Sequence, residues 1–300
     1  MIRFGVAGYP PAFYSSPFGK NRMDICHWLQ TLGLEALELQ MTYGPRTSID
    51  NCIAYRTAAE DYGIKLSVHA AYFIVFTSDD KEKIKRSSDT LKRTVELCEV
   101  LNADIAVLHP GPLYGNSDSK PILNRFIDNL GTALLDIGKT QTGIFVETAG
   151  KVGQLGSVED ILTICDELQN VYPCIDFGHI HARTLGGLGD DEAVNQLFNQ
   201  LSEHGCFDSN RRIHFHYTPI EYGKRGEITH RAIYDRQNAN PGRQERLSLD
   251  PPDEADYFYP RYEPVAKGLF DWNVNGTVIS ETNNSQEEGA LHLKSAYKRK

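Results

Sequence analysis

Short apolar runs alternate with longer amphipathic stretches along most of this 300-residue chain. The short runs are rich in Ile, Val and Leu at successive positions, which is typical of strands buried on both faces of a parallel sheet. The stretches between them repeat apolar residues at helical spacing. We therefore predict strands at residues 2–7, 36–39, 66–69, 105–109, 144–147, 174–176, 213–216 and 277–281.

Helix-sized segments fill the intervals between most of these strands. Ser48 can cap one helix, and Ser157 with Asp160 three residues later is close to a capping box for another. This α/β alternation in a chain of this length favours one (β/α)8 TIM barrel over residues 1–300. No Gly-x-Gly-x-x-Gly motif follows the first strand, so the dinucleotide-binding alternative lacks its signature. The predicted helices are residues 23–32, 48–62, 81–101, 121–138, a helix after Ser157, 190–204 and a terminal helix.

One segment interrupts the alternation. Residues 238–272 are rich in Pro, Asp, Arg and Tyr, and they predict a long irregular insertion between strands seven and eight. Loops longer than about 15 residues in compact domains are usually functional or disordered. Because the aromatic side chains of this segment need a surface to pack against, we expect an ordered lid or rim element.

Six of the predicted strands end in side chains that can bind a metal ion. A buried apolar strand tolerates an imidazole or a carboxylate at its tip only where something satisfies that group. The carboxyl ends of parallel barrel strands converge on one face, so these side chains predict a polynuclear metal site. Histidine and carboxylate ligands suit zinc, manganese and iron alike. The candidate ligands are His69, His109, Glu147, Asp176 with His179, His216 and Glu281.

Other histidines are weaker candidates. His214 shares its strand parity with His216, and we expect it deeper in the barrel interior. His181 follows His179 by two residues, and we expect it in a loop or in the surroundings of the ligands. His27 and His204 lie in predicted helices, where surface histidines are common.

Composition limits the classes of protein that fit. The net charge of −9 argues against nonspecific nucleic-acid binding, although a nuclease can combine an acidic metal site with a locally basic groove. The six cysteines are scattered without a Cys-x-x-Cys motif, and no signal peptide is evident. No apolar run approaches the roughly 20 residues that span a bilayer. We expect a cytoplasmic protein with reduced thiols and no membrane contact.

Several of these segments resemble a known family. They are similar to the signature segments of endonuclease IV, a family of zinc-dependent apurinic/apyrimidinic endonucleases within the xylose-isomerase-like TIM barrels. The resemblance runs from about residue 60 to residue 285, in the family's order. The similar segments are Val68-His-Ala-Ala-Tyr-Phe73, Leu108-His-Pro-Gly111, Glu147-Thr-Ala-Gly150, Cys174-Ile-Asp-Phe-Gly-His179 and Ser280-Glu-Thr282.

The resemblance implies a ligand set for two or three zinc ions. It implies that His69, His109 and Glu147 hold one zinc, and that Glu147 is the catalytic bridge to a second. The remaining ligands that it implies for the second zinc are Asp176, His216 and Glu281.

The third zinc site departs from the family pattern. His179 matches it, but the family's Asp-x-His pair is replaced here by Glu227-Ile-Thr-His230. Glu227 and His230 are the available substitutes, and their spacing of three suits one face of a helix.

The resemblance also implies contacts with DNA. Tyr72 and Phe73 stand where the family inserts a pair of side chains into the base stack beside an abasic nucleotide. Arg46, in the loop after strand two, is a candidate for a groove or phosphate contact. Further candidates for phosphate contacts are Lys224, Arg225 and Arg231.

Two functions remain open at this point. The first is a monomeric zinc-dependent endonuclease of base-excision repair, which cleaves abasic duplex DNA 5′ to the lesion. The second is an isomerase or epimerase of a sugar or sugar phosphate, with one divalent ion and a carboxylate pair such as Glu147 and Glu281. The number of candidate ligands favours the nuclease, whereas the acidic charge and the divergent Glu227–His230 segment favour the sugar enzyme. A non-enzymatic binding barrel would leave these buried titratable groups unexplained.

Overall fold

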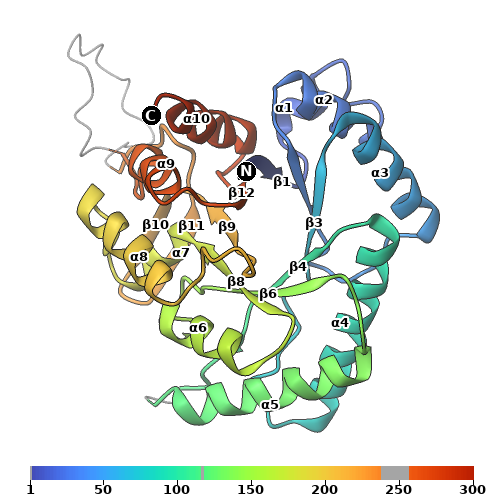
Figure 1. Ribbon diagram of the computed structural model, residues 1–300, viewed down its shortest axis with the longest axis vertical. Coiled ribbons are helices and arrows are strands. Elements are labelled where there is room, and N and C mark those ends of the chain that lie inside the picture. Colours follow the sequence, from blue (N-terminus) through green and yellow to red (C-terminus); the bar gives the residue numbers. More distant parts are fainter. Residues whose placement is uncertain (1, 116–117, 238–256) are drawn as a thin grey trace, which may run out of the picture.

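Eight parallel strands close into a barrel in the computed structural model, which describes residues 2–115, 118–237 and 257–300 (Figure 1). The predicted (β/α)8 fold is confirmed. Around the barrel the order is β1 (Ile2–Ala7), β12 (Gly276–Ser280), β9 (His214–Tyr217), β8 (Val171–Asp176), β6 (Gly143–Glu147), β4 (Ile105–Leu108), β3 (Lys65–His69) and β2 (Ala36–Gln40).

Helices surround this ring of strands (Figure 1). Their starts follow local sequence signals: Ser48 accepts a hydrogen bond from Asn51 N, and Ser157 with Asp160 forms a capping box. The longer helices are α2 (Ile25–Thr31), α3 (Ile49–Tyr62), α4 (Lys81–Leu101), α5 (Lys120–Ile137), α6 (Val158–Glu167), α8 (Asp191–Glu203), α9 (Tyr262–Asp271) and α10 (Gln286–Lys298). Shorter turns of helix are α1 (Pro11–Ser15), η1 (Arg22–Asp24) and α7 (Phe177–Arg183).

The apolar core has two parts. A large cluster lies between the outward side chains of the strands and the helices, and it includes Phe4, Phe126 and Phe215. Inside the barrel, the apolar side chains form two small separate clusters. Other inward positions carry fully buried polar groups, among them Glu38 and His214. The barrel interior is therefore partly polar even below its mouth.

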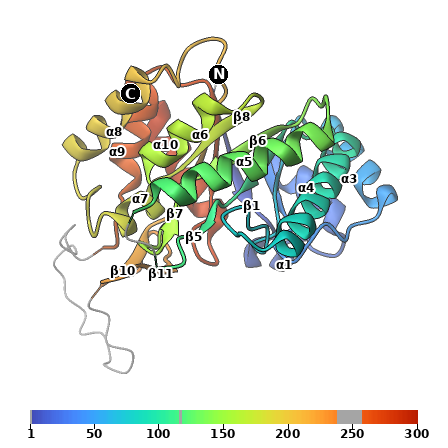
Figure 2. The same cartoon turned by 90° about the horizontal axis from the view of Figure 1, so that it is seen from below.

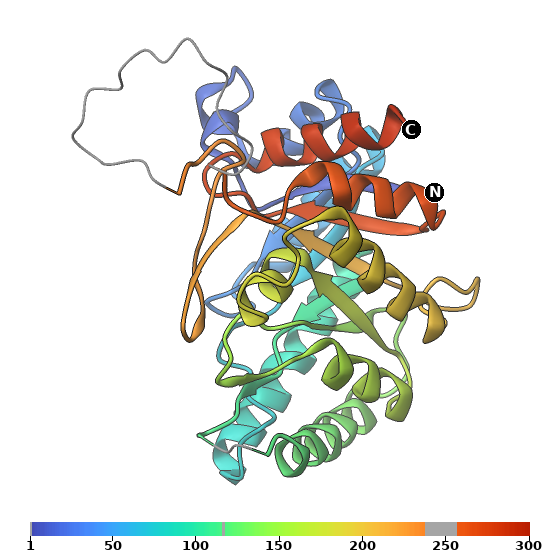
Figure 3. The same ribbon diagram turned by 90° about the vertical axis from the view of Figure 1, so that its left-hand side faces the viewer.

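Two small antiparallel pairs of strands lie outside the barrel. β5 (Gly111–Pro112) pairs with β7 (Gln154–Leu155), and β10 (Ile220–Gly223) pairs with β11 (Gly226–His230). Both pairs lie at the same end of the barrel, where β4, β6 and β9 end (Figure 2). Figure 3 shows the β10–β11 hairpin, in orange, projecting beyond the strands of the barrel.

The predicted irregular insertion at residues 238–272 is wrong in its last part. Residues 238–256 lie outside the described residues, but α9 occupies most of the remainder and packs against α8 and α10. Val265, Ala266 and Leu269 are buried with helical spacing. Pro264 falls in the first turn, where backbone N–H groups have no partner within the helix, so it does not break the helix. Among the described helices, none is long and apolar enough to cross a membrane.

We expect Gly5→Ala to destabilise the barrel, because a Cβ atom at Gly5 would lie 2.1 Å from the carbonyl oxygen of Ala36 on β2. Forced overpacking of this kind typically costs about 1–3 kcal/mol. Chemical denaturation measures the free energy of unfolding, and Gly153→Ala is the control, since nothing lies within 4 Å of its added Cβ. Equal stability of the two variants would contradict this account of the β1–β2 contact.

Candidate metal centre

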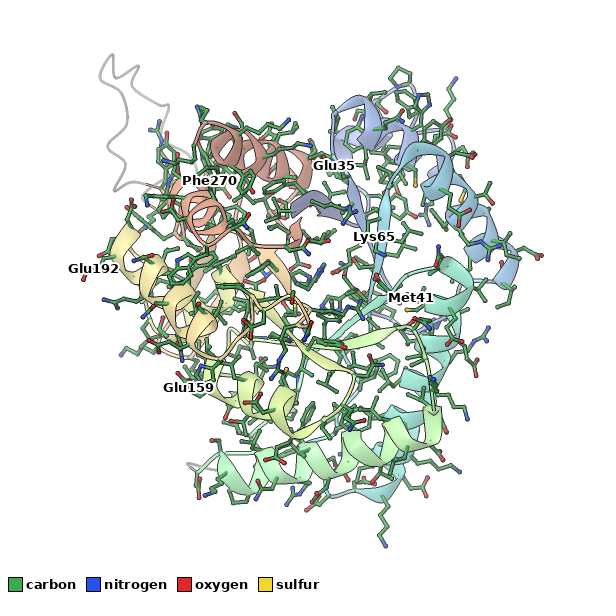
Figure 4. All side chains as sticks on the ribbon, viewed as in Figure 1. Glu35, Met41, Lys65, Glu159, Glu192 and Phe270 are labelled. Atoms are coloured by element: carbon green, nitrogen blue, oxygen red, sulfur yellow. The ribbon has the colours of Figure 1, made fainter. Side chains whose placement is uncertain are left out.

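Glu147 lies at the centre of the candidate site. It is the last residue of β6, and its side chain is 0% exposed. His69 at the end of β3 and His216 on β9 both contact this carboxylate. Figure 4 shows side chains filling the inside of the ring of strands. Burying a carboxylate without compensation is costly, so the groups around Glu147 determine how it can be accommodated.

The two carboxylate oxygens of Glu147 face different pairs of histidines. Oε2 lies 3.1 Å from His69 Nε2 and 3.3 Å from His109 Nε2. Oε1 lies 3.0 Å from His216 Nδ1 and 3.2 Å from His179 Nδ1. The two oxygens of Glu147 therefore face different histidines, as suits a carboxylate shared between two groups of ligands.

The candidate ligands form three groups of donor atoms. In each group the donor atoms lie within 4.8 Å of one another. Glu147 belongs to the first two groups. The groups are His69, His109 and Glu147; Glu147, Asp176, His216 and Glu281; and His179, Glu227 and His230.

Hydrogen bonds orient several of these imidazoles toward the shared space. His69 Nδ1 lies 3.0 Å from the carbonyl oxygen of Ala70, which leaves Nε2 facing Glu147. His179 Nδ1 lies 2.9 Å from the carbonyl oxygen of Thr148, and its Nε2 faces Glu227 at 3.8 Å. Metal-binding histidines usually have one ring nitrogen held in this way, so these residues fit a divalent metal ion.

Two ligands of the third group, Glu227 and His230, lie on a strand. The prediction that they share one face of a helix is therefore wrong. Both residues lie on β11, where residues three apart normally point to opposite faces. On β10, the neighbours Glu221 and Tyr222 pair with Thr229 and Glu227 of β11. Ile228 between these two partners is therefore an extra residue in the pairing. This β-bulge returns Glu227 and His230 to the same face.

The segment after β6 holds the hairpin close to His179. Glu227 N donates to the carbonyl oxygen of Gly150 at 3.0 Å. A Cβ atom at Gly150 would lie 2.8 Å from Glu227 Oε2 and 3.0 Å from His179 Cδ2. Only glycine at this position lets the backbone approach the third group so closely.

Burial and charge shift the ionisation of the cluster in opposite directions. Burial acts to raise the pKa of Glu147, but His109, His216 and His179 together hold it well below its usual range. For His69, burial acts to lower the pKa, but the hydrogen bond and the charge of Glu147 raise it to about 9. For His109, burial prevails over the attraction of Glu147 and lowers the pKa to about 4.

The candidates for DNA contacts lie around the mouth of the barrel. Tyr72 is 64% exposed and Phe73 is 44% exposed, and their rings meet edge to face. Arg46 is exposed beside them. A Cβ atom added to Gly44 would lie 3.9 Å from Arg46 Nε and would also contact the ring of Phe73, so both side chains lie next to Gly44. Arg231 is already ion-paired with Glu221.

Lys224 and Arg225 are exposed at the turn of the β10–β11 hairpin.

His181 is buried in α7, not in a loop, and it accepts a hydrogen bond from Leu188 N. All six cysteines are buried and unpaired.

The sequence analysis assigned no role to Glu38 or Thr148, although both contact candidate ligands. Glu38 on β2 is fully buried, and it lies 3.0 Å from His216 Nε2. Thr148 holds His179 through its carbonyl oxygen. A signal for Glu38 was present, because a single carboxylate interrupts the otherwise apolar run Ala36-Leu-Glu-Leu39.

The closed parallel barrel, with polar side chains gathered where its strands end, defines the TIM-barrel class. The chain belongs to the xylose isomerase-like TIM barrel family, whose model matches residues 26–298. Its predicted place within these barrels is thereby confirmed. Proteins that the chain resembles in sequence or in fold are named as a probable endonuclease, an epimerase and a putative xylose isomerase.

Among relatives by sequence, one spans almost the whole chain. A Methanocaldococcus jannaschii protein named "Uncharacterized protein MJ0133" is 29% identical over 300 residues, which cover 98% of this chain and 96% of that protein. A probable endonuclease 4 of Sulfurihydrogenibium sp. is 28% identical over 153 residues, which cover 50% of this chain and 54% of that protein. The matched region is thus about half the length of that endonuclease.

Among solved structures, nucleases and sugar epimerases are similarly close. Endonuclease IV from Thermus thermophilus aligns with a TM-score of 0.67 and 14% identity, over 99% of this chain and 100% of that one. D-Psicose 3-epimerase from Clostridium cellulolyticum aligns with a TM-score of 0.64 and 13% identity, over 99% and 98%. At these identities the likeness shows the fold alone.

We expect His230→Ala to lower the metal content of the purified protein by about one ion per chain and to spare the other ions. The reason is that His230 belongs only to the third group of donor atoms. Elemental analysis measures the content, and His204→Ala, on the surface at the end of α8, is the control. An unchanged metal content would mean that the hairpin is not a metal ligand.

Proposed function

We propose that this protein is a zinc-dependent endonuclease that hydrolyses the phosphodiester bond 5′ to abasic sites in duplex DNA. The observation that carries the proposal is the presence of three groups of donor atoms, two of which share Glu147. A barrel enzyme that isomerises a sugar with one divalent ion needs only one such group. The third group therefore favours phosphodiester chemistry.

Zinc, when bound, would supply a water of lowered pKa and would neutralise charge on the phosphodiester. The protein's own contribution begins with Glu147, whose two oxygens face separate pairs of histidines. Asp176 and Glu281 add two more carboxylates to the second group. Because the site supplies these carboxylates and imidazoles in one place, no separate lysine or serine nucleophile is required.

The surface beside the mouth supports a polymeric substrate. Exposed aromatic rings follow one another there, with Tyr43 against Tyr72 and Tyr72 against Phe73. Beyond Phe73 lies an open cavity of about 540 Å³, bordered by Tyr114 and by the cations Lys83 and Arg86. Stacking surfaces interleaved with cations suit the bases and phosphates of a nucleic-acid strand.

The backbone of this cavity has an unusual conformation at one position. Tyr114 has a positive φ of 55°, which a residue with a side chain adopts at a cost, and its side chain is 51% exposed. Pro112, which lines this cavity, is three residues after His109, so the segment that follows β4 connects the cavity lining to the candidate metal centre. These features support a strand of DNA that continues past the metal centre.

A sugar isomerase or epimerase remains the second candidate. Glu147 and Glu281 lie in one group of donor atoms, as a carboxylate pair that moves a proton would require. The acidic net charge of −9 also favours a small substrate over DNA. The metal content distinguishes the two functions: three zinc ions per chain support the nuclease, and one manganese or magnesium ion supports the sugar enzyme.

We expect Glu147→Gln to reduce turnover on abasic duplex DNA by at least about 100-fold. The reason is that a neutral amide cannot bridge two ions as a carboxylate does. Steady-state cleavage of a duplex with one abasic analogue measures the effect, and Glu99→Gln on the exposed face of α4 is the control. Turnover within tenfold of the wild type, at full metal content, would refute the role of Glu147.

We expect replacement of both Tyr72 and Phe73 by Ala to weaken binding to abasic duplex by about 10- to 1000-fold. Unmodified duplex should be affected far less, because its base stack is not opened. Binding is compared at one fixed salt concentration, since phosphate contacts depend on salt.

The control for this double variant is Phe270→Ala, which removes an exposed ring on α9, at the outer surface of the molecule (Figure 4). Metal content should be unchanged in both proteins. A wild type that binds abasic and intact duplex equally would remove the main support for the nuclease and favour the sugar enzyme.

A further inference from the structure

A buried carboxylate lies directly beneath the candidate metal centre. Glu38 is in the middle of β2, between Leu37 and Leu39, and its side chain is 0% exposed. Around it no lysine or arginine approaches within 4 Å among the described residues; its ionic contacts are with two histidines. A buried carboxylate requires such partners, so this arrangement is a built feature of the barrel interior.

The contacts of Glu38 hold its carboxylate in one orientation. Oε2 accepts a hydrogen bond from Ser67 Oγ at 2.9 Å and lies 2.9 Å from His214 Nε2. Oε1 lies 3.0 Å from His216 Nε2. Among the described residues, neither Glu38 Oε1 nor His216 Nε2 has a hydrogen bond of normal geometry, and the close ionic contact of 3.0 Å between them is the interaction that each of them makes.

The opposite side of the His216 ring faces the candidate ligands. His216 Nδ1 lies 3.0 Å from Glu147 Oε1 and 3.7 Å from Glu281 Oε1. A neutral ring that carries its proton on Nε2, the nitrogen next to Glu38, has its lone pair on Nδ1. That lone pair then points at the second group of donor atoms.

We propose that Glu38 is a positioning residue for the metal centre, which fixes the orientation and the tautomer of His216 so that Nδ1 binds the ion. Carboxylates that hold the far nitrogen of a metal-binding histidine are a general means of setting ligand geometry, and their loss typically lowers metal affinity by about 10- to 100-fold. Ser67 and His214 act indirectly, because they keep Glu38 from turning away. The inference rests on metal binding by the second group, which both candidate functions share, and not on the substrate.

A different explanation of the same residues is an additional metal site inside the barrel. Cys174, His214 and His216 each have a donor atom within 4.8 Å of the others. Both imidazoles, however, have Nε2 within 3.0 Å of a Glu38 oxygen, and His214 Nε2 is hydrogen-bonded to it, so both nitrogens contact a carboxylate without an ion.

The test compares the metal affinity of Glu38→Gln with that of Ser67→Ala by competition with a chelator. We expect Glu38→Gln to lose about 10- to 100-fold in affinity at one site per chain and to retain the others. Ser67→Ala removes one hydrogen bond from the same carboxylate but leaves Glu38 beside His216, so we expect it to lose clearly less affinity than Glu38→Gln. Wild-type affinity in Glu38→Gln, or equal losses in both variants, would overturn the proposal.

A second measurement needs no variant. In the zinc-loaded wild type, long-range proton–nitrogen correlation spectra should show His216 protonated on Nε2 and not on Nδ1. A proton on Nδ1 would overturn the proposal even if Glu38→Gln failed to fold. Loss of an ion in Cys174→Ser would also overturn it, in favour of a metal site inside the barrel.

The outcome for the wild type separates this inference from the proposed function. A wild type without an ion at the second group overturns the metal assignment and the role of Glu38 together. Full wild-type metal content with unchanged affinity in Glu38→Gln overturns the role of Glu38 alone.

Discussion

The arrangement of the site follows from the burial of one carboxylate, Glu147, at the end of β6. Its charge is balanced by imidazoles from β3, β8–α7 and β9, and no lysine or arginine contacts it among the described residues. Imidazoles can give up their protons to an ion, whereas a lysine or arginine would retain its positive charge and repel one. The same constraint that makes Glu147 tolerable in the interior thus also prepares the site for metal ions.

The barrel explains why distant residues could be predicted to meet. His69 and Glu147 are 78 positions apart, yet both end parallel strands whose carboxyl ends share one face. The alternation of strands and helices was therefore sufficient to predict the barrel, and the strand ends were sufficient to predict which side chains gather there. That these residues bind zinc remains a prediction.

Features that depend on pairing outside the barrel could not be predicted in the same way. The bulge at Ile228 arises from how β11 pairs with β10, and a local spacing of three residues suggests a helix instead. The helix α9 was hidden by the Pro and Tyr residues around it, although its buried positions have helical spacing. Glu38 was missed because an alternating strand with one carboxylate resembles a strand with a solvent-facing position.

The β10–β11 hairpin gives the candidate metal centre a modular construction. Two groups of donor atoms come from the barrel strands and the residues directly after them, whereas the third takes Glu227 and His230 from a hairpin that shares no ladder with the barrel sheet. Removal of the one extra residue at Ile228 would turn His230 to the opposite face without disturbing any barrel strand. A descendant of this chain could thus exchange a three-group centre for a two-group centre by a single-codon deletion, and change its chemistry while keeping its fold.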